Sequence, residues 1–406
     1  MRVLIDLSGF DTSYQGGVAR YSLEISKALV SKSPNNIEIL ASTDNLKFLS
    51  DFFSPETSIK AFETSCGITA RILYWFVYRI YPMPSLLRSA QKRHFKNVIA
   101  YCDNFGSLIY TPTTYLNFVP KYAKTLVSLH DCQEEKYPMY FSKTIRKYRK
   151  SNAVNTLANS TAIQVSSNFI GNEIKTYFSN KQRDNFFIIP EGCNLNDFRP
   201  VDKYSKEDTF QIFVPASFHP HKNQRVLLDA LEKYKFSRPL KVIFSGHINS
   251  LSLSLQKEYE FRSEISVEYP GFLEDRELKR LYVESDVVIS TSLYESSSLP
   301  LLEAMASGTL VIASDIPSHI EMSETFNILL FESESAKSLA SILNDTICLS
   351  EENYLLHISQ NLQKIEESSW DTIAERYLDL IDNLQDSIKF SWNQSFKPRN
   401  NYMEKG

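Results

Sequence analysis

The sequence lacks several features that would each point to a particular class of protein. No run of 18 uncharged apolar residues occurs, so no segment is expected to span a membrane. Residues 1–7 are too short an apolar stretch for a signal peptide. The five cysteines show no paired metal spacing and leave one unmatched, which fits a reducing cytoplasm. No Asp-x-Asp pair is present to hold a divalent cation.

What is present is a long chain of ordinary globular composition with an uneven charge distribution. At 406 residues it is too long for a single ordinary core, so two domains are expected. Residues 1–200 carry 24 Lys and Arg against 16 Asp and Glu, whereas the remainder carries 20 basic and 32 acidic residues. The two halves are therefore expected to face different surroundings.

Short apolar runs alternate with helical or polar stretches along both halves, a pattern typical of parallel α/β sheets. In the first half we predict strands at residues 2–7, 37–41, 107–110, 125–129, 162–165 and 186–189. A polar linker follows residue 190, and a second series begins at residue 210. We therefore predict an α/β fold with two Rossmann-like domains, residues 1–200 and 209–369, separated by a cleft. A helix near 370–385 and a loosely held tail at 387–406 complete the prediction.

The most informative stretch is residues 294–308, in which Glu295 and Glu303 flank a turn that opens a helix. Pro300 suits the first helical turn, and Gly308 lies where a C-cap is expected. Ligands of parallel sheets bind at the carboxyl ends of strands, beside helix amides that attract phosphate. Carboxylates there can accept hydrogen bonds from sugar hydroxyls, so the pattern predicts a ligand with both a phosphate and a polyol. The alternative is two solvated acids on a surface helix.

A second candidate site lies where the strand beginning at residue 210 leads into a loop containing Lys222. An ammonium beside the amides that open the next helix can share a diphosphate with them. The alternative is a solvated lysine at a helix start. His219 and His221 flank a proline, but no third ligand of suitable type is evident, so no metal site is predicted.

Together, these motifs resemble the retaining family-4 glycosyltransferases, a part of glycosyl transferases group 1 with the GT-B fold. The matching segments, in order, are Gly16-Gly17-Val-Ala-Arg20-Tyr, His130-Asp131, Val165 to Phe169, Ile189 to Pro200, Pro220 to Asn223, Gly271-Phe-Leu, the 294–308 stretch and Trp370. The resemblance implies a metal-independent enzyme without a cofactor. It also implies an acceptor-binding first domain and a second domain that binds a nucleotide sugar.

The same resemblance assigns roles to individual residues. Glu303 would accept hydrogen bonds from the donor ribose, and Glu295 would lie near the transferred sugar. Lys222 would neutralise the leaving diphosphate, and His130 would line the cleft near sugar and acceptor; an ordinary buried histidine is its alternative. Gly17, beside Gly16, would let the first domain approach the phosphates. The backbone amides of the helix entrance would hold diphosphate and sugar oxygens; they belong to Ser297, Ser298 and Leu299.

Three departures from the family pattern bear on donor choice and activity. Ser296-Ser297-Ser298 replaces the usual Gly-Phe-Gly, and Glu191 stands where the linker commonly has Asn. A basic residue often found at or near Ser217 or His221 is missing, so Lys222 is the remaining cation of that loop.

The basic first half contains an acid-free stretch, residues 64–102, which is also rich in aromatic residues. Basic and aromatic side chains together suit the surface of an anionic bilayer. We therefore predict peripheral membrane contact; a buried helix with a solvated basic face is the alternative. No nucleic-acid-binding module accompanies the charge. The residues named for this contact are Arg71, Trp75, Arg79, Lys92 and Arg93.

These observations predict a glycosyltransferase that moves a hexose, with retention, from a nucleoside diphosphate sugar to a glycan or lipid-linked acceptor. This activity would fit a role in bacterial surface polysaccharide synthesis (O-antigen, capsule or exopolysaccharide). It would also fit a location in the cytoplasm, at the inner face of the cell membrane. The alternatives are a catalytically weak, glycosyltransferase-like binding subunit and a GT-B nucleotide-sugar epimerase.

Overall fold

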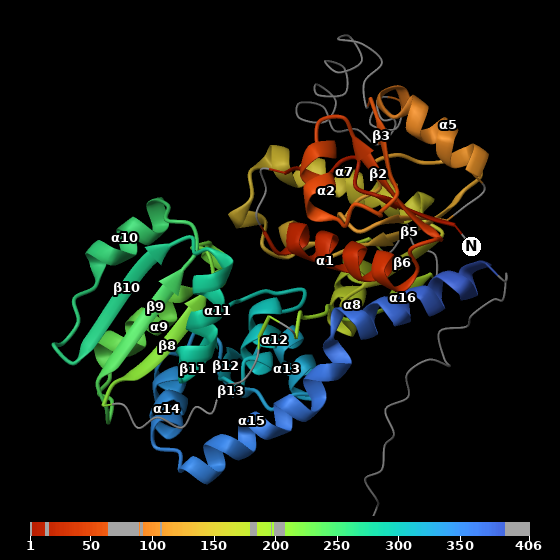
Figure 1. The fold of residues 1–406 in the computed structure, drawn as a ribbon. Coiled ribbons are helices and arrows are strands. Elements are labelled where there is room, and N and C mark those ends of the chain that lie inside the picture. Colours follow the sequence, from red (N-terminus) through yellow and green to blue (C-terminus); the bar gives the residue numbers. More distant parts are fainter. Residues whose placement is uncertain are drawn as a thin grey trace, which may run out of the picture.

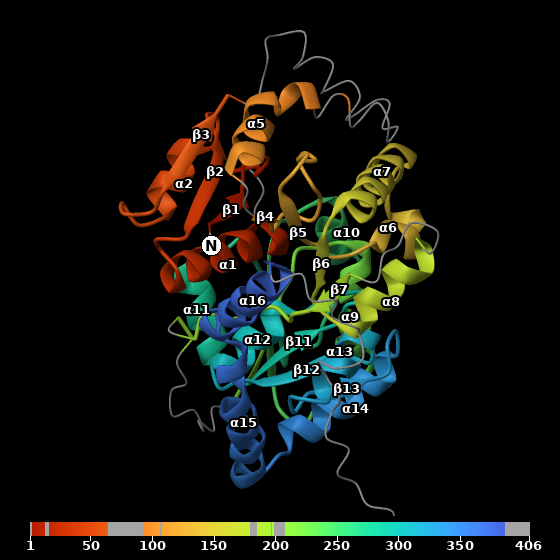
Figure 2. The same ribbon diagram turned by 90° about the vertical axis from the view of Figure 1, so that its right-hand side faces the viewer.

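The computed structural model describes residues 2–12, 16–63, 89, 92–105, 108–178, 185–195, 197–198 and 208–385. Its strands form two separate sheets in two lobes (Figures 1 and 2). The expected tail at 387–406 lies outside the described residues.

The first sheet has seven parallel strands in the order β3-β2-β1-β4-β5-β6-β7. The strands are β1 Val3–Asp6, β2 Ile37–Ser42, β3 Ile59–Phe62, β4 Leu108–Thr111, β5 Lys124–Ser128, β6 Ala162–Val165 and β7 Phe186–Ile188. The accompanying helices are α1 Gly17–Lys32, α2 Leu46–Phe52, α5 Lys96–Phe105, α6 Gln133–Lys136, the 3₁₀ turn Pro138–Tyr140, α7 Lys143–Asn159 and α8 Asn168–Tyr177.

The second sheet has six parallel strands in the order β10-β9-β8-β11-β12-β13. The strands are β8 Phe210–Pro215, β9 Leu240–Ser245, β10 Ile265–Gly271, β11 Val287–Ser290, β12 Leu310–Ser314 and β13 Leu329–Phe331. The helices are the 3₁₀ turn η3 Pro220–Lys222, α9 Gln224–Lys233, α10 Ser250–Glu258, α11 Asp275–Glu284, α12 Leu299–Ala306, α13 Pro317–Ser323, α14 Ala336–Ile347 and α15 Glu351–Ile365.

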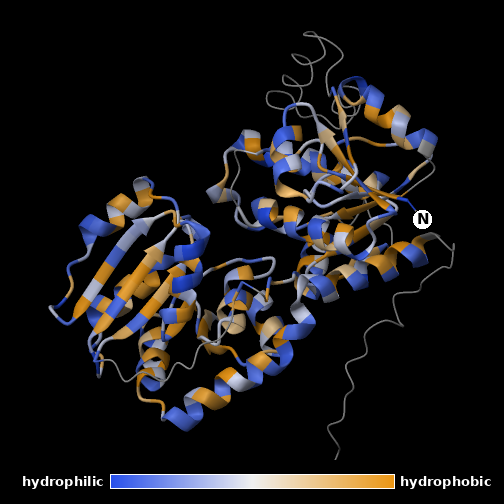
Figure 3. Ribbon diagram, viewed as in Figure 1, coloured by the Kyte–Doolittle hydropathy of each residue, from blue (hydrophilic) through white to orange (hydrophobic). Residues whose placement is uncertain are grey.

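The central strands of each sheet are buried on both faces, as is usual for parallel sheets, whereas the edge strands β3 and β10 are partly exposed. Along β1, Val3 and Ile5 pack into the cluster that holds α1, whereas Leu4 packs on the opposite face with residues of α5. In Figure 3 the strands are largely hydrophobic and the hydrophilic residues lie mainly on helices and loops. The predicted α/β fold of two parallel-sheet, Rossmann-like lobes is confirmed.

The last helix, α16 Trp370–Gln385, returns to the first lobe and packs against α1 (Figure 1). Ile373, Ala374 and Tyr377 of α16 are fully buried there. Helix α16 follows the 3₁₀ turn Glu366–Ser368, where the chain returns to the first lobe. The chain thus crosses between the lobes twice, near residue 193 and near residue 368. The two crossing segments lie side by side and are joined by a hydrogen bond from the Cys193 amide to the Ser368 carbonyl at 2.7 Å. The two lobes are therefore joined by a paired connection.

Candidate functional site

The stretch that contains the two glutamates is a strand, loop, helix and strand: β11, residues 291–298, α12 and β12. Pro300 lies in the first turn of α12, and Gly308 follows the helix with a φ of 68°, in the left-handed region. Ser298 is the N-cap and is buried. The amides that open a helix have no acceptor within it, so the entrance of α12 is suited to anionic oxygens.

Glu295 lies against Lys222, and the two come from neighbouring loops of the second lobe. Their Oε1 and Nζ atoms are 2.5 Å apart, and the Ser292 hydroxyl donates to the same carboxylate at 2.5 Å. Burial alone would raise the pKa of Glu295, but the charge and hydrogen bond of Lys222 outweigh it and lower that pKa. Glu295 is therefore an ionised carboxylate at neutral pH.

The loop that carries Lys222 is fixed by the residues just before Glu295. Thr291 donates its hydroxyl hydrogen to the Lys222 carbonyl at 2.6 Å, and the Leu293 amide donates to the His221 carbonyl at 2.7 Å. Burial and the neighbouring Lys222 lower the pKa of His221 to about 4. Among the described residues, no group of three or more His, Cys, Asp and Glu side chains is arranged to hold a metal ion.

Glu303 lies against Arg20, which belongs to the other lobe. Arg20 Nη1 and Glu303 Oε1 are 2.5 Å apart; the Glu303 side chain is 5% exposed and that of Arg20 is 37% exposed. Tyr282 adds a hydrogen bond to the carboxylate. Burial raises the pKa of Glu303, an effect that Arg20 and Tyr282 oppose. This contact between α1 and α12 was not predicted, because in the sequence Arg20 stands out only as part of the Gly-Gly motif.

The glycine pair lies next to Arg20. Gly16 is the N-cap of α1, and Gly17 is its first residue. A Cβ added at Gly17 would meet no atom within 4 Å, so the packing of the protein itself does not demand glycine there. The pair nevertheless places the first turn of α1, and with it Arg20, opposite α12.

His130 is buried at the carboxyl end of β5, and its ring nitrogens have different environments. Nε2 is 2.9 Å from the Pro112 carbonyl, which can only accept, so this nitrogen carries the hydrogen. Nδ1 faces Glu191 Oε1 at 3.9 Å. Burial lowers the pKa of His130, and it raises the pKa of Glu191 to about 8, with a contribution from Glu295. The two groups therefore face each other as neutral side chains rather than as an ion pair.

The motif loop also contacts the first lobe directly. The Ser166 hydroxyl donates to the Ser296 carbonyl at 2.8 Å. Tyr294 lies among the rings of Tyr137 and Phe169, with centroid distances of 6.0 and 5.7 Å. The loop expected to bind the sugar is thus held between both lobes.

A further contact between the lobes involves Glu321 of α13. Its carboxylate accepts hydrogen bonds from the amides of Asn168 and Phe169, at 2.7 and 2.9 Å, at the N-terminus of α8. A negative charge at this end of a helix is favourable because it complements the helix dipole.

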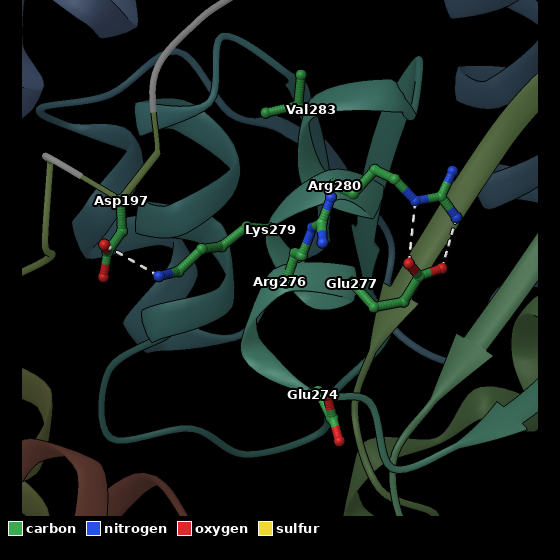
Figure 4. A pocket seen from close by; sticks show the side chains of 7 residues that line it. All are labelled: Asp197, Glu274, Arg276, Glu277, Lys279, Arg280 and Val283. Atoms are coloured by element: carbon green, nitrogen blue, oxygen red, sulfur yellow. Dashed lines mark hydrogen bonds and ion pairs between the residues drawn. The ribbon is translucent and has the colours of Figure 1, made fainter.

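A separate hollow lies along α11, near the linker (Figure 4). Charged side chains line it in pairs: Lys279 contacts Asp197 at 2.9 Å, and Arg280 contacts Glu277 at 2.5 Å. None of residues 294–308, and neither Lys222 nor Arg20, lines this hollow, so it is separate from the candidate site. Its lining comprises Asp197, Glu274, Arg276, Glu277, Lys279, Arg280 and Val283.

The residues predicted for membrane contact are only partly covered by the structure. Arg71, Trp75 and Arg79 lie outside the described residues, whereas Lys92 and Arg93 are exposed in a short helical segment before α5. No helix in the described part of the chain is both long and apolar enough to cross a bilayer.

The sequence is similar to a known protein family and to several curated proteins. Residues 197–364 match the family model described as "Glycosyl transferases group 1". O-antigen chain mannosyltransferase B of Escherichia coli is 24% identical over 390 residues, covering 93% of this chain and 92% of the relative. O-antigen chain mannosyltransferase RfbU of Salmonella typhimurium is 27% identical over 214 residues, covering 52% of this chain and 58% of the relative.

Solved structures share the fold at low sequence identity. Anabaena HepE, crystallised with UDP and glucose, aligns with a TM-score of 0.67 and 18% identity over 94% of this chain and 100% of that one. WaaG, a glycosyltransferase involved in lipopolysaccharide biosynthesis, aligns with a TM-score of 0.64 and 13% identity, covering 93% and 99%. The fold is that of the GT-B glycosyltransferases. The second lobe in addition matches the glycosyl transferases group 1 family model.

Proposed function

We propose that this chain transfers a hexose from a nucleoside diphosphate sugar to a glycan or lipid-linked acceptor, with retention, during bacterial surface polysaccharide synthesis. The names of the Escherichia coli and Salmonella relatives, both O-antigen chain mannosyltransferases, support the pathway. The UDP and glucose bound to Anabaena HepE support a nucleotide-sugar donor.

The observation that carries the proposal is the pairing of the two motif glutamates with two basic residues at one junction. Lys222 contacts Glu295 from within the second lobe, and Arg20 contacts Glu303 from the first. Such a place offers cations for a diphosphate and carboxylates for hydroxyl groups. In the proposed complex, ribose hydroxyls replace Arg20 as partners of Glu303.

The proposed reaction depends on charge stabilisation. The acceptor hydroxyl attacks the anomeric carbon on the face that the diphosphate leaves, and a leaving phosphate oxygen takes the hydroxyl proton. Negative charge grows on that oxygen, where Lys222 and the amides that open α12 stabilise it. Because these groups supply the positive charge, the proposed reaction requires no metal ion, and EDTA is expected to leave the rate unchanged.

The test begins with a thermal-shift panel of UDP-, GDP-, ADP- and TDP-sugars on the purified chain. A donor present at 100 times its Kd should stabilise the protein by about 2.7 kcal/mol. Release of the nucleoside diphosphate with acceptor, followed by NMR assignment of the product's anomeric configuration, then tests transfer and retention. If no donor raises the melting temperature and none is consumed, the proposed function is wrong.

We also propose that the first lobe docks on an anionic membrane surface to reach a lipid-linked acceptor. The described residues that support this are at and before α7, where Met139 and Ile145 are 73% and 48% exposed, next to the exposed Lys143 and Lys147. Each basic residue near such a surface contributes about 1 kcal/mol. The chain should co-sediment with vesicles containing phosphatidylglycerol but not with pure phosphatidylcholine, and high salt should release it. Equal sedimentation with both vesicle types would contradict the proposal.

A further inference from the structure

Tyr294 belongs to the second lobe by its place in the sequence, but its side chain is buried in the first lobe. It directly precedes Glu295 in the motif loop, residues 291–298, and is 3% exposed. The hydrophobic cluster that contains it is otherwise made of first-lobe residues, among them Leu129, which follows β5, and Ile170 of α8. The proposed reaction assigns no role to this tyrosine.

Side chains of the first lobe surround the Tyr294 ring. The rings of Tyr137 and Phe169 meet it at steep angles, 80° and 61°. The ammonium of Lys136 lies over two of these rings, 4.8 Å from the centroid of Phe169 and 5.7 Å from that of Tyr294. Edge-to-face ring contacts and cation–π contacts both add to the free energy gained from burial. The position of the Tyr294 ring is therefore set by the first lobe.

The backbone on both sides of Glu295 is held by the same lobe. The Tyr137 hydroxyl donates to the Leu293 carbonyl at 3.1 Å, and the Ser166 hydroxyl donates to the Ser296 carbonyl at 2.8 Å. These carbonyls lie two residues before and one residue after Glu295. The segment that carries Glu295 is thus attached to the first lobe at two carbonyls and at the ring between them.

The side chains assigned to the nucleotide are carried differently. Lys222 ends the 3₁₀ turn η3 and Glu303 belongs to α12, so both are carried by elements of the second lobe. The Lys222 loop is fixed within that lobe, because the Thr291 hydroxyl donates to the Lys222 carbonyl. Glu295, by contrast, lies where the motif loop passes from contacts with the second lobe to contacts with the first.

We infer that Tyr294 is a positioning residue: the packing of its ring in the first lobe holds Glu295 where it can bind the transferred sugar. This inference rests on the proposed function and deepens it, because it makes sugar binding, but not nucleotide binding, depend on contact between the lobes. A shift of about 1 Å in a positioned group can cost about 10²-fold in rate. Loss of the Tyr294 ring should therefore slow transfer through its effect on Glu295.

The first experiment follows the motif loop without any ligand, by hydrogen–deuterium exchange of a peptide that covers residues 291–298. In Tyr294→Ala the loop should open locally and exchange about tenfold faster than in the wild type. Tyr294→Phe keeps the ring and should exchange like the wild type. Tyr294→Leu replaces the alanine variant if that variant does not fold.

Phe178→Ala is the matched control for lost stability. Phe178 is 4% exposed and belongs to the same cluster, but it follows the C-terminal end of α8, whereas Phe169 lies at the start of that helix. Its removal should lower the melting temperature and leave exchange of the motif loop unchanged.

The second experiment measures nucleoside diphosphate release with UDP-glucose, GDP-mannose, ADP-glucose and TDP-glucose as donors. For the accepted donor, kcat/KM should fall about 10–100-fold in Tyr294→Ala, while inhibition by the matching free nucleoside diphosphate should stay within about twofold of the wild-type value. Tyr294→Phe should restore kcat/KM, and Phe178→Ala should keep it.

The outcomes separate the two proposals. If the wild-type protein consumes none of these donors, the proposed function is wrong for them and the inference fails with it. If the wild-type protein transfers sugar but Tyr294→Ala transfers equally fast, or its motif loop exchanges no faster, the inference alone is overturned. Equal losses in Phe178→Ala, or an equal loss of inhibition by the free nucleotide, would also overturn it.

Discussion

Replacing Lys222 by methionine removes the ammonium and keeps most of the side-chain volume. The Lys222 side chain is 21% exposed and that of Glu295 is 15% exposed, so both are only partly screened by water. Loss of one preorganised group that stabilises developing charge costs about 2.7–4 kcal/mol of barrier. Transfer should therefore slow by about 10²–10³-fold. The pKa of Glu295 should rise as well, because Lys222 is what keeps it low.

The same substitution should also destabilise the fold, and a second variant separates the two effects. Removing one partner of a buried ion pair costs about 3–5 kcal/mol; partial exposure places this pair at or below the lower end. Lys222→Met/Glu295→Gln removes the unpaired charge and should recover much of the melting temperature without recovering transfer. Lys233→Met is the control, since this exposed lysine of α9 lies beside Asp229. Nucleoside diphosphate release is the assay for all variants, and wild-type rates in folded Lys222→Met would refute the role.

Two further predictions concern the connection between the lobes. Glu321→Ala removes the carboxylate at the N-terminus of α8 and should weaken the contact between the lobes by about 1 kcal/mol. This loss should appear as faster proteolysis of the linker. Glu324→Ala, at an exposed neighbouring position, is the control and should not change the rate of proteolysis. Gly192→Ala would place a Cβ 2.6 Å from Trp370 and should destabilise the protein by about 1–3 kcal/mol, whereas Gly17→Ala, with no atom within 4 Å, should melt like the wild type. If the two alanine variants have the same melting temperature, the connection beside Trp370 can accommodate the added methyl group and this prediction is wrong.

Local signals in the sequence predicted the order of the elements and the geometry of the motif. Apolar runs predicted the strands β11 and β12, and Pro300 and Gly308 marked the start and the end of the helix between them. Each of these signals acts over a few residues, so it can be read from the chain directly. Three elements were not predicted: the edge strand β3 Ile59–Phe62, the edge strand β13 Leu329–Phe331 and helix α15 Glu351–Ile365. A three-residue strand is too short to show a period, and α15 exposes Leu355 and Leu356, which blurs its apolar face.

Contacts between the lobes could not be predicted in the same way. Arg20 and Glu303 belong to different lobes, and neither has a sequence neighbour that reveals the other. The same holds for Glu321 and the amides that open α8. Such pairs depend on how the two sheets are oriented, and this orientation involves contacts far apart in the sequence, such as the paired crossings at residues 193 and 368. Periodicity within either lobe carries no information about that orientation.

If the proposed donor site is correct, the Arg20–Glu303 contact would connect ligand binding to the arrangement of the lobes. Glu303 is the proposed ribose acceptor, and in the structure its carboxylate is held by a side chain of the opposite lobe. In the proposed complex, ribose hydroxyls and Arg20 would therefore compete for one buried carboxylate. A donor that bound Glu303 in this way would free the Arg20 guanidinium next to Gly16 and Gly17, where the resemblance places the phosphates. Loss of one contact between the lobes would then supply a second cation for the diphosphate, in a chain whose Lys222 loop lacks the family's usual basic partner.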